Sequence, residues 1–135
     1  MTKAEQFECE VREHAEVVTI SAAARITAAA RAMRGHKVGC LVVVDDRDEM
    51  VGIVSERDIL DWVSKSSPET FTARVADIMA SNVIFCTPQT PMEEAEELMA
   101  QYGIRHLPVV DGGRPVGMIS SRDVMSHQLR AREAE

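Results

Sequence analysis

Two serine–aspartate pairs are the residues of this sequence best suited to chemistry. Ser55 stands three residues before Asp58, Ser120 stands three before Asp123, and each serine directly follows an apolar run. If each run is a strand and each serine begins a helix, the free N–H groups of the helix start favour an anion. The serine hydroxyl can donate to a phosphate, and the aspartate can accept from the hydroxyls of a ribose. The pattern therefore indicates a nucleotide site.

The same two pairs also fit a purely structural interpretation. A serine at a helix N-cap with an acidic residue three positions later is close to a capping box, which stabilises a helix by about 1 kcal/mol. Gly52 and Gly117 stand three residues before the serines and permit the close approach of a backbone or of a ligand. Capping and nucleotide binding therefore both remain open from the residues alone.

Other candidates lie near these pairs or near the ends of apolar runs. Arg57 and Arg122 precede the aspartates, where they can pair with carboxylates, reach phosphate or face solvent. Ser21 and Thr87 can contact adenine or phosphate, or can be plain turn residues. The further candidates Val38 and Ile104 can sandwich a base or belong to the core.

Both pairs belong to a duplicated stretch of the sequence. Residues 41–45 match 107–111 at an offset of 66, and residues 51–59 match 116–124 at an offset of 65. One residue is missing from the intervening turn of the second copy, and the match also continues upstream. Such a repeat predicts one supersecondary unit that is present twice.

The hydrophobic pattern predicts the order β-α-β-β-α in each copy. The second copy is predicted to have a strand at 83–86, a helix at 92–102 ended by Gly103, strands at 107–110 and 116–119, and a helix from Ser120 towards Arg130. The first copy is predicted to have a helix at 22–34 ended by Gly35, strands at 41–44 and 51–54, and a helix through 59–63. Each small sheet has one apolar face. We therefore expect an α/β protein in which the copies pack sheet to sheet as one pseudo-symmetric globule.

Composition excludes several classes of function. The chain has 135 residues and a net charge of −7, so it lacks the basic surface of a nucleic-acid binder and is not suited to an anionic membrane. No apolar run approaches the ~20 residues that span a bilayer. The widely spaced cysteines and histidines predict no metal site, and no catalytic motif is visible. Free thiols without a signal peptide indicate the cytoplasm.

The motifs resemble those of the CBS domain family. Val51–Leu60, Ile104–Asp111 and Val75–Met79 carry the resemblance, which covers about residues 15–127. It implies a tandem pair, also called a Bateman module. The expected segments are an acidic N-terminal segment (1–14), motif 1 (15–64), a linker (65–74), motif 2 (75–127) and a C-terminal end (128–135).

The resemblance implies a function as well as a fold. Tandem CBS pairs bind AMP, ADP, ATP, NAD or S-adenosylmethionine in the cleft between the copies, dimerise and regulate a partner. It implies that the aspartates take the ribose hydroxyls, that the serines lie near the phosphates, and that Arg105 and His106 line the cleft. From the residues alone, Arg105 and His106 can also be surface charge beside a strand. Gly39 and Cys40 stand at the corresponding positions of the first copy, so the two pockets are not expected to be equivalent.

We therefore expect a non-catalytic regulatory module that binds an adenine nucleotide and acts on an enzyme, transporter or other effector in trans, because the pair fills nearly the whole chain. One alternative is a structural or dimerisation module with empty pockets. Another is a small nucleotide hydrolase, although the motifs show no paired general acid and base.

Overall fold

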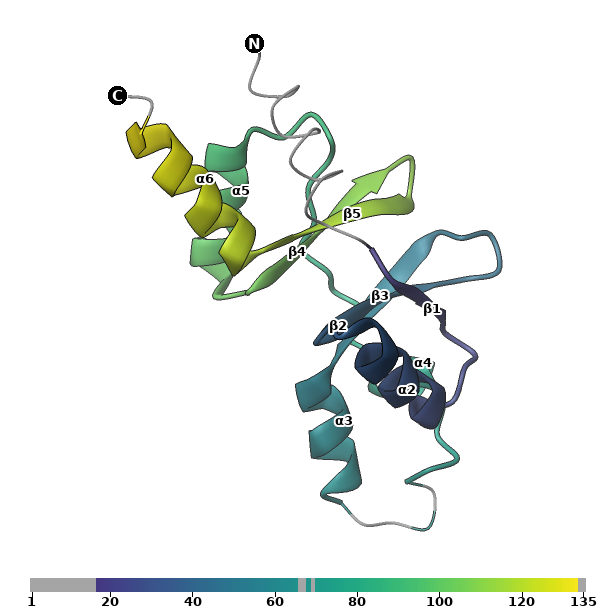
Figure 1. The fold of residues 1–135 in the computed structure, drawn as a ribbon. Helices are drawn as coiled ribbons and strands as arrows, with labels where there is room; N and C mark the ends of the chain where they lie inside the picture. Colours follow the sequence, from purple (N-terminus) through teal and green to yellow (C-terminus); the bar gives the residue numbers. More distant parts are fainter. Residues whose placement is uncertain (1–16, 66–67, 69, 134–135) are drawn as a thin grey trace. The chain divides into compact units, whose positions relative to one another are not determined.

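The computed structural model describes residues 17–65, 68 and 70–133 (Figure 1). The chain divides into two compact units. We call Val18–Val83 the N-terminal unit, and we call the unit that contains residues 84–133 the C-terminal unit. Each has its own buried core, so each is described by itself.

The N-terminal unit is a three-stranded sheet with helices packed against it. Its elements are β1 (Thr19–Ser21), α2 (Ile26–His36), β2 (Cys40–Val44), β3 (Met50–Ser55), α3 (Glu56–Val63) and α4 (Val75–Ile78). The strand order is β1-β2-β3, with β1 parallel and β3 antiparallel to β2. All five residues of the central strand β2 are buried, as expected for a strand covered on both faces.

The core of this unit joins both strands of the hairpin to α2 and α4. Its members are apolar side chains that are almost completely buried. They are Ala29, Met33, Leu41, Val43, Val54 and Val75. The predicted hairpin and the helix through 59–63 are confirmed within one or two residues.

The prediction for α2 was wrong at both ends. The helix begins at Ile26 because the residues before it bond to other segments: Ala22 N–H donates to the Val44 carbonyl, and the Ala24 carbonyl accepts from Val75 N–H at 2.7 Å. The helix continues past Gly35 to His36, because the left-handed residue that ends it is Lys37, with φ of 56°. Lys37 matches Gly103 of the second copy at the offset of 66 and closes the helix in the same way.

The segment that follows the linker packs on the N-terminal unit. Ile53 and Ala80 exchange two backbone hydrogen bonds of 2.9 Å each. A Cβ atom at Gly52 would lie 2.6 Å from Met79 Sδ and 2.8 Å from the Ala80 carbonyl oxygen. Gly52 therefore permits the close approach of a backbone. The boundaries predicted at 65 and 75 separate the two sequence motifs from the linker, and they stay a prediction. The compact units are defined by contacts instead, and the N-terminal unit extends to Val83.

The C-terminal unit is an antiparallel hairpin with two helices. Its elements are α5 (Met92–Tyr102), β4 (His106–Asp111), β5 (Arg114–Ser120) and α6 (Ser121–Glu133), and α5 lies beside α6 in Figure 1. Gly112 and Gly113 have positive φ in the turn between the strands. These elements confirm the predicted helices and hairpin. The core consists of Cys86, Met92, Ala95, Met99, Leu107, Val109 and Ile119.

The predicted strand at 83–86 is reduced to a single bridge between Cys86 and Val109. In the N-terminal unit, the matching strand is extended by bonds from Val42 N–H to Val18 and from Ala22 N–H to Val44. The residues at the two donor positions in the second copy are Pro108 and Pro88. Proline has no N–H to donate, so both flanking bonds are lost and no strand forms.

Candidate functional site

The first candidate site is the junction between β3 and α3. Ser55 is the N-cap of α3, and its hydroxyl accepts from Asp58 N–H at 3.3 Å. Asp58 Oδ2 accepts from the Ser55 N–H at 2.8 Å and from the Ser55 hydroxyl at 3.0 Å. These bonds form a complete capping box, as the structural interpretation of the sequence predicted.

The second candidate site is the junction between β5 and α6, and it has the same geometry. Asp123 N–H donates to the Ser120 hydroxyl at 3.2 Å. Asp123 Oδ2 accepts from the Ser120 N–H at 2.7 Å and from the Ser120 hydroxyl at 3.0 Å. The serine–aspartate pattern therefore builds one local structure twice.

Capping leaves part of each aspartate available. The capping bonds use Oδ2, and among the described residues Oδ1 of Asp58 and of Asp123 accepts no hydrogen bond. Both aspartates are only partly buried. An ionised carboxylate with a free oxygen can accept from a ribose hydroxyl without losing the cap. The serine hydroxyls, in contrast, donate to the aspartates, so donation to a phosphate would break a capping bond.

The residue before the second strand of each copy lies beside its junction. Glu56 N–H donates to the Gly39 carbonyl at 2.9 Å, and Ser121 N–H donates to the Arg105 carbonyl at 3.0 Å. Strand pairing then sets the next residue of each copy opposite the capping serine, so that Cys40 pairs with Ser55 and His106 with Ser120. The structure thus brings together Arg105, His106, Ser120 and Asp123, which the sequence had proposed as candidates.

Ser21 and Thr87 lie away from the junction of their own unit. Ser21 pairs with Val44, at the opposite end of β2 from Ser55. Its hydroxyl accepts from Ala23 N–H at 3.1 Å. Thr87 N–H donates to Thr90 Oγ1 at 3.0 Å. Both residues hold turns in this structure.

The remaining candidates separate by exposure. Val38 and Ile104 are partly buried and pack against the cores of their units. Arg57 and Arg122 are exposed on the first turns of α3 and α6, one residue before the aspartates. The arginines are therefore accessible to an anion, whereas the two apolar residues have a packing role.

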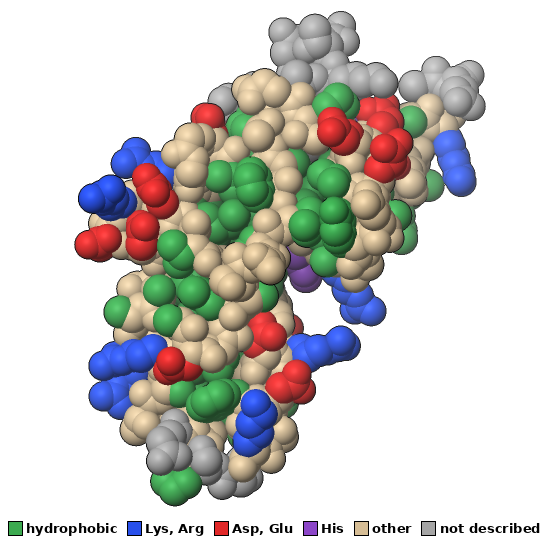
Figure 2. All heavy atoms as spheres, turned by 180° about the vertical axis from the view of Figure 1, so that it is seen from behind, with side chains coloured by type: hydrophobic (Ala, Val, Ile, Leu, Met, Phe, Trp, Pro, Cys, Tyr) green, Lys and Arg blue, Asp and Glu red, His purple; other side chains and the backbone are tan. Residues whose placement is uncertain are grey.

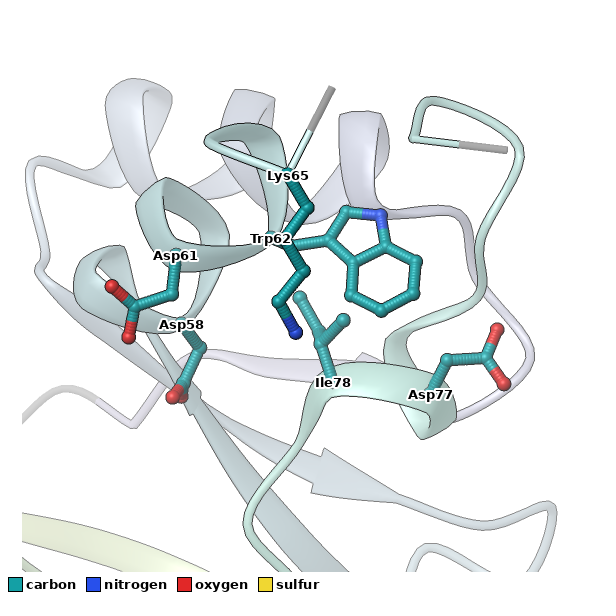
Figure 3. Close-up of a pocket in the computed structure, with 6 residues that line it drawn as sticks. All are labelled: Asp58, Asp61, Trp62, Lys65, Asp77 and Ile78. Atoms are coloured by element: carbon teal, nitrogen blue, oxygen red, sulfur yellow. The ribbon is translucent and has the colours of Figure 1, made fainter. Parts of the chain in front are cut away.

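An open cavity of about 200 Å³ next to Asp58 was missed by the sequence analysis. It lies between α3 and α4 and is lined by Asp58, Asp61, Trp62, Lys65, Asp77 and Ile78 (Figure 3). The Lys65 ammonium lies 5.4 Å from the centre of the Trp62 ring, a cation–π contact. Trp62 Nε1–H donates to the Thr70 carbonyl at 2.9 Å. The single tryptophan of the chain was the available signal.

Two cysteines are buried and free, one in each unit. Burial, with a smaller contribution from the charge of Glu56, raises the pKa of Cys40 to about 11. Burial, followed by the charge of Glu94, raises the pKa of Cys86 to about 12. Both thiols are therefore protonated at neutral pH and poorly suited to act as nucleophiles.

The residues that the structure describes offer neither a metal site nor a membrane-spanning helix. No cluster of three or more His, Cys, Asp or Glu residues there could hold a metal ion. No helix formed by residues 17–65, 68 and 70–133 has the length and apolar character to cross a membrane.

The chain is similar in sequence to proteins of other organisms. The chain is 36% identical over 113 residues to the protein MK0525 of Methanopyrus kandleri, covering 82% of this chain and 57% of that protein. It thus spans little more than half of that relative's length.

Two solved structures with bound ligands have the same fold. The crystal structure of CBSX2 in complex with AMP has a TM-score of 0.75 and 28% identity, covering 90% of this chain and 92% of that one. The CBS domain pair of MJ0100, in complex with 5′-methylthioadenosine and S-adenosylmethionine, has a TM-score of 0.76 and 26% identity, covering 90% of this chain and 96% of that one.

The CBS domain family model matches the chain twice, over residues 10–65 and 75–130. Each match contains one hairpin and one capped junction of the kind described above. The duplicated sequence, the mixed α/β units and the solved neighbours agree on one assignment. This chain belongs to the CBS domain family and carries two copies of the domain.

Proposed function

We propose that this chain is a non-catalytic regulatory module that binds an adenosyl ligand through Asp58 and Asp123. The observation that carries the proposal is the free Oδ1 atom of each capping aspartate, repeated at both junctions. The neighbours bound to AMP and to S-adenosylmethionine and 5′-methylthioadenosine support an adenosyl ligand. AMP, ADP and ATP are the first candidates, followed by NAD and S-adenosylmethionine.

The proposed ligand acts on a partner in trans by binding one conformation of the module better than another. Both described cysteines are free, which supports a reducing compartment such as the cytoplasm. The function thus consists of binding and signalling, without turnover of the ligand.

The test is a thermal melt with AMP, ADP, ATP, NAD or S-adenosylmethionine. A ligand present at ~100 times its dissociation constant adds about 2.7 kcal/mol of stability, a shift of several degrees for a domain of this size. We expect a shift with at least one ligand and its loss on Asp58→Ala or Asp123→Ala. Ser55→Ala and Ser120→Ala are the matched controls, because they weaken the same caps and retain the aspartates. The absence of a shift with every ligand would contradict the proposal.

A second candidate function is self-association. All residues of α3 and α6 are described, and neither helix has a buried residue. Leu60 is 69% exposed, Met125 62% and Leu129 53%, and Figure 2 shows hydrophobic side chains at the surface beside charged ones. Exposed apolar side chains on one helix are typical of an interface, here with a second copy.

Light scattering tests this second function. We expect a homodimer at micromolar concentration and its loss on Leu60→Glu or Met125→Glu. Gln128→Glu is the control for Met125→Glu, because it adds the same single negative charge to an exposed position of α6 without removing an apolar side chain. A monomeric wild-type protein would exclude the dimer.

A further inference from the structure

The two junctions share their capping geometry and differ in the charge beside it. By the repeat, Gly39 corresponds to Arg105 at an offset of 66, and Glu56 corresponds to Ser121 at an offset of 65. Each pair is joined by the same backbone hydrogen bond, of 2.9 Å in the first copy and 3.0 Å in the second. The residues of each pair therefore occupy equivalent positions of the backbone.

In the N-terminal unit, that place holds a carboxylate. A Cβ atom at Gly39 would lie only 2.5 Å from Glu56 Oε1, so the carboxylate fills the space that a side chain at position 39 would need. The charge of Glu56 also contributes to the raised pKa of Cys40, the residue opposite Ser55 in the sheet. The first junction thus carries negative charge at the start of its helix.

The cavity beside Asp58 extends this negative surface. Asp58 and Asp61 place carboxylates on the same side of this cavity, against the single ammonium of Lys65, whereas the Asp77 carboxylate points away from them and accepts from Arg74 N–H (Figure 3). A phosphate near this junction would meet like charges, of which the partly buried Asp58 repels it more than the exposed Glu56 and Asp61 do.

In the C-terminal unit, the equivalent positions carry a hydroxyl residue, Ser121, and a basic residue, Arg105. Ser121 Oγ donates to the Arg105 carbonyl at 3.4 Å, and Arg105 is exposed. His106 begins β4 opposite Ser120, where the first copy has Cys40. Arg122 does not distinguish the two junctions, because Arg57 occupies the same place in the first. Guanidinium groups bind phosphate through charge-assisted hydrogen bonds. This junction suits an anion.

We infer that the β5–α6 junction takes the phosphate-bearing adenylate, and that the β3–α3 junction takes an adenosyl ligand without phosphate, either neutral or cationic. The inference rests on the proposed function, since it names the ligand class of the same two junctions. In this proposal, Glu56 determines the ligand preference of the β3–α3 junction, and Arg105 determines that of the β5–α6 junction.

AMP and adenosine form the matched pair of probes, because they share the ribose and differ by the phosphate. Isothermal titration of Asp58→Ala reports the second junction, and titration of Asp123→Ala reports the first. We expect AMP to bind at least about tenfold tighter than adenosine to Asp58→Ala, and adenosine to bind tighter than AMP to Asp123→Ala. Equal preferences in the two variants would overturn the inference.

Charge variants test the two named residues. In the Asp58→Ala background, the double substitution Arg105→Gly with Ser121→Glu copies the residues of the first junction. We expect it to weaken the binding of AMP about tenfold and to change the binding of adenosine less than about twofold. Arg105→Lys is the control that retains the charge. In the Asp123→Ala background, Glu56→Gln retains the shape of the side chain and removes its charge, so it should strengthen the binding of AMP. A parallel loss of AMP and adenosine would show a structural role and overturn the inference.

These titrations separate the two proposals. Binding of adenosine and AMP with no dependence on Glu56 or Arg105 would overturn the inference and leave the proposed function intact. If neither probe binds the wild-type protein and ADP, ATP, NAD and S-adenosylmethionine do not bind either, both proposals fall.

Discussion

The β3–α3 junction and the β5–α6 junction agree within 0.1 Å in all three capping hydrogen bonds. They differ in the residues beside them, which are Gly39 and Glu56 at the first junction and Arg105 and Ser121 at the second. The agreement follows from a demand of folding, because each helix start needs its N–H groups satisfied. The neighbouring charge is under no such demand. In our proposal, the capping geometry shared by the two copies marks the sites, and the unequal residues around it set what each site prefers.

The largest effect should come from a contact of the N-terminal unit at Gly52. A Cβ atom there meets Met79 Sδ and the Ala80 carbonyl, so Gly52→Ala should lower the free energy of unfolding by about 1–3 kcal/mol. Gly35 lies inside α2 with nothing within 4 Å, so Gly35→Ala should raise it by about 0.5–1 kcal/mol. Urea unfolding measures both, and equal effects would contradict this packing.

The buried thiols compare the two units through pH. Their folded pKa values, about 11 for Cys40 and about 12 for Cys86, lie above the ordinary value of 9.0. The folded state therefore holds these protons more tightly, and the stability they contribute is present below pH 9 and lost as pH rises towards the folded values. Each thiol should contribute a slope of up to about 1.4 kcal/mol per pH unit.

Urea unfolding of wild type, Cys40→Ala and Cys86→Ala between pH 8 and about pH 10.5 checks this expectation. Each variant should lose one part of the slope. A slope unchanged in both variants would show that the thiols titrate normally in the folded protein.

Trp62 provides a sharper contrast, because His127 occupies its place in the second copy at the offset of 65. Trp62→Phe removes the bond to the Thr70 carbonyl and weakens the Lys65 contact, so it should cost about 1–2 kcal/mol. Lys65→Met separates the two contributions, since it removes the cation alone. Chemical denaturation followed by circular dichroism gives the values, and an unchanged stability of Trp62→Phe would exclude the anchoring role.

The smallest expected difference is between the two caps. Ser55→Ala and Ser120→Ala should each cost about 1 kcal/mol, and the two costs should agree closely because the bond lengths agree. Thermal unfolding of both variants measures this. A large cost at one serine alone would break the equivalence of the junctions on which the comparison depends.

Local features of the fold could be predicted from the sequence because they depend on neighbouring residues. The hairpins, α5 with Gly103 at its end, and the serine caps follow from alternation, turn residues and N-cap chemistry within a few positions. The repeat also contained a signal for the end of α2. At the offset of 66, Lys37 aligns with Gly103, so the alignment assigns the left-handed position to Lys37 instead of Gly35.

The errors have long-range causes. The start of α2 depends on bonds between Ala24 and Val75, which no local pattern reveals. The missing strand near Cys86 depends on Pro108, a residue of its partner strand. At the site, Ser55 and Asp58 were predictable, whereas the Glu56–Gly39 contact required the fold that brings the two residues together.

The central claim is that the capping aspartates also bind the ribose of an adenosyl ligand. Titration calorimetry of AMP into wild type, Asp123→Ala and Ser120→Ala tests it most directly, because both variants weaken one cap and only one removes the carboxylate. The account predicts that Ser120→Ala retains AMP binding and that Asp123→Ala binds AMP at least about tenfold more weakly. Equal binding by the two variants would contradict the account and leave the serine–aspartate pair with a capping role alone.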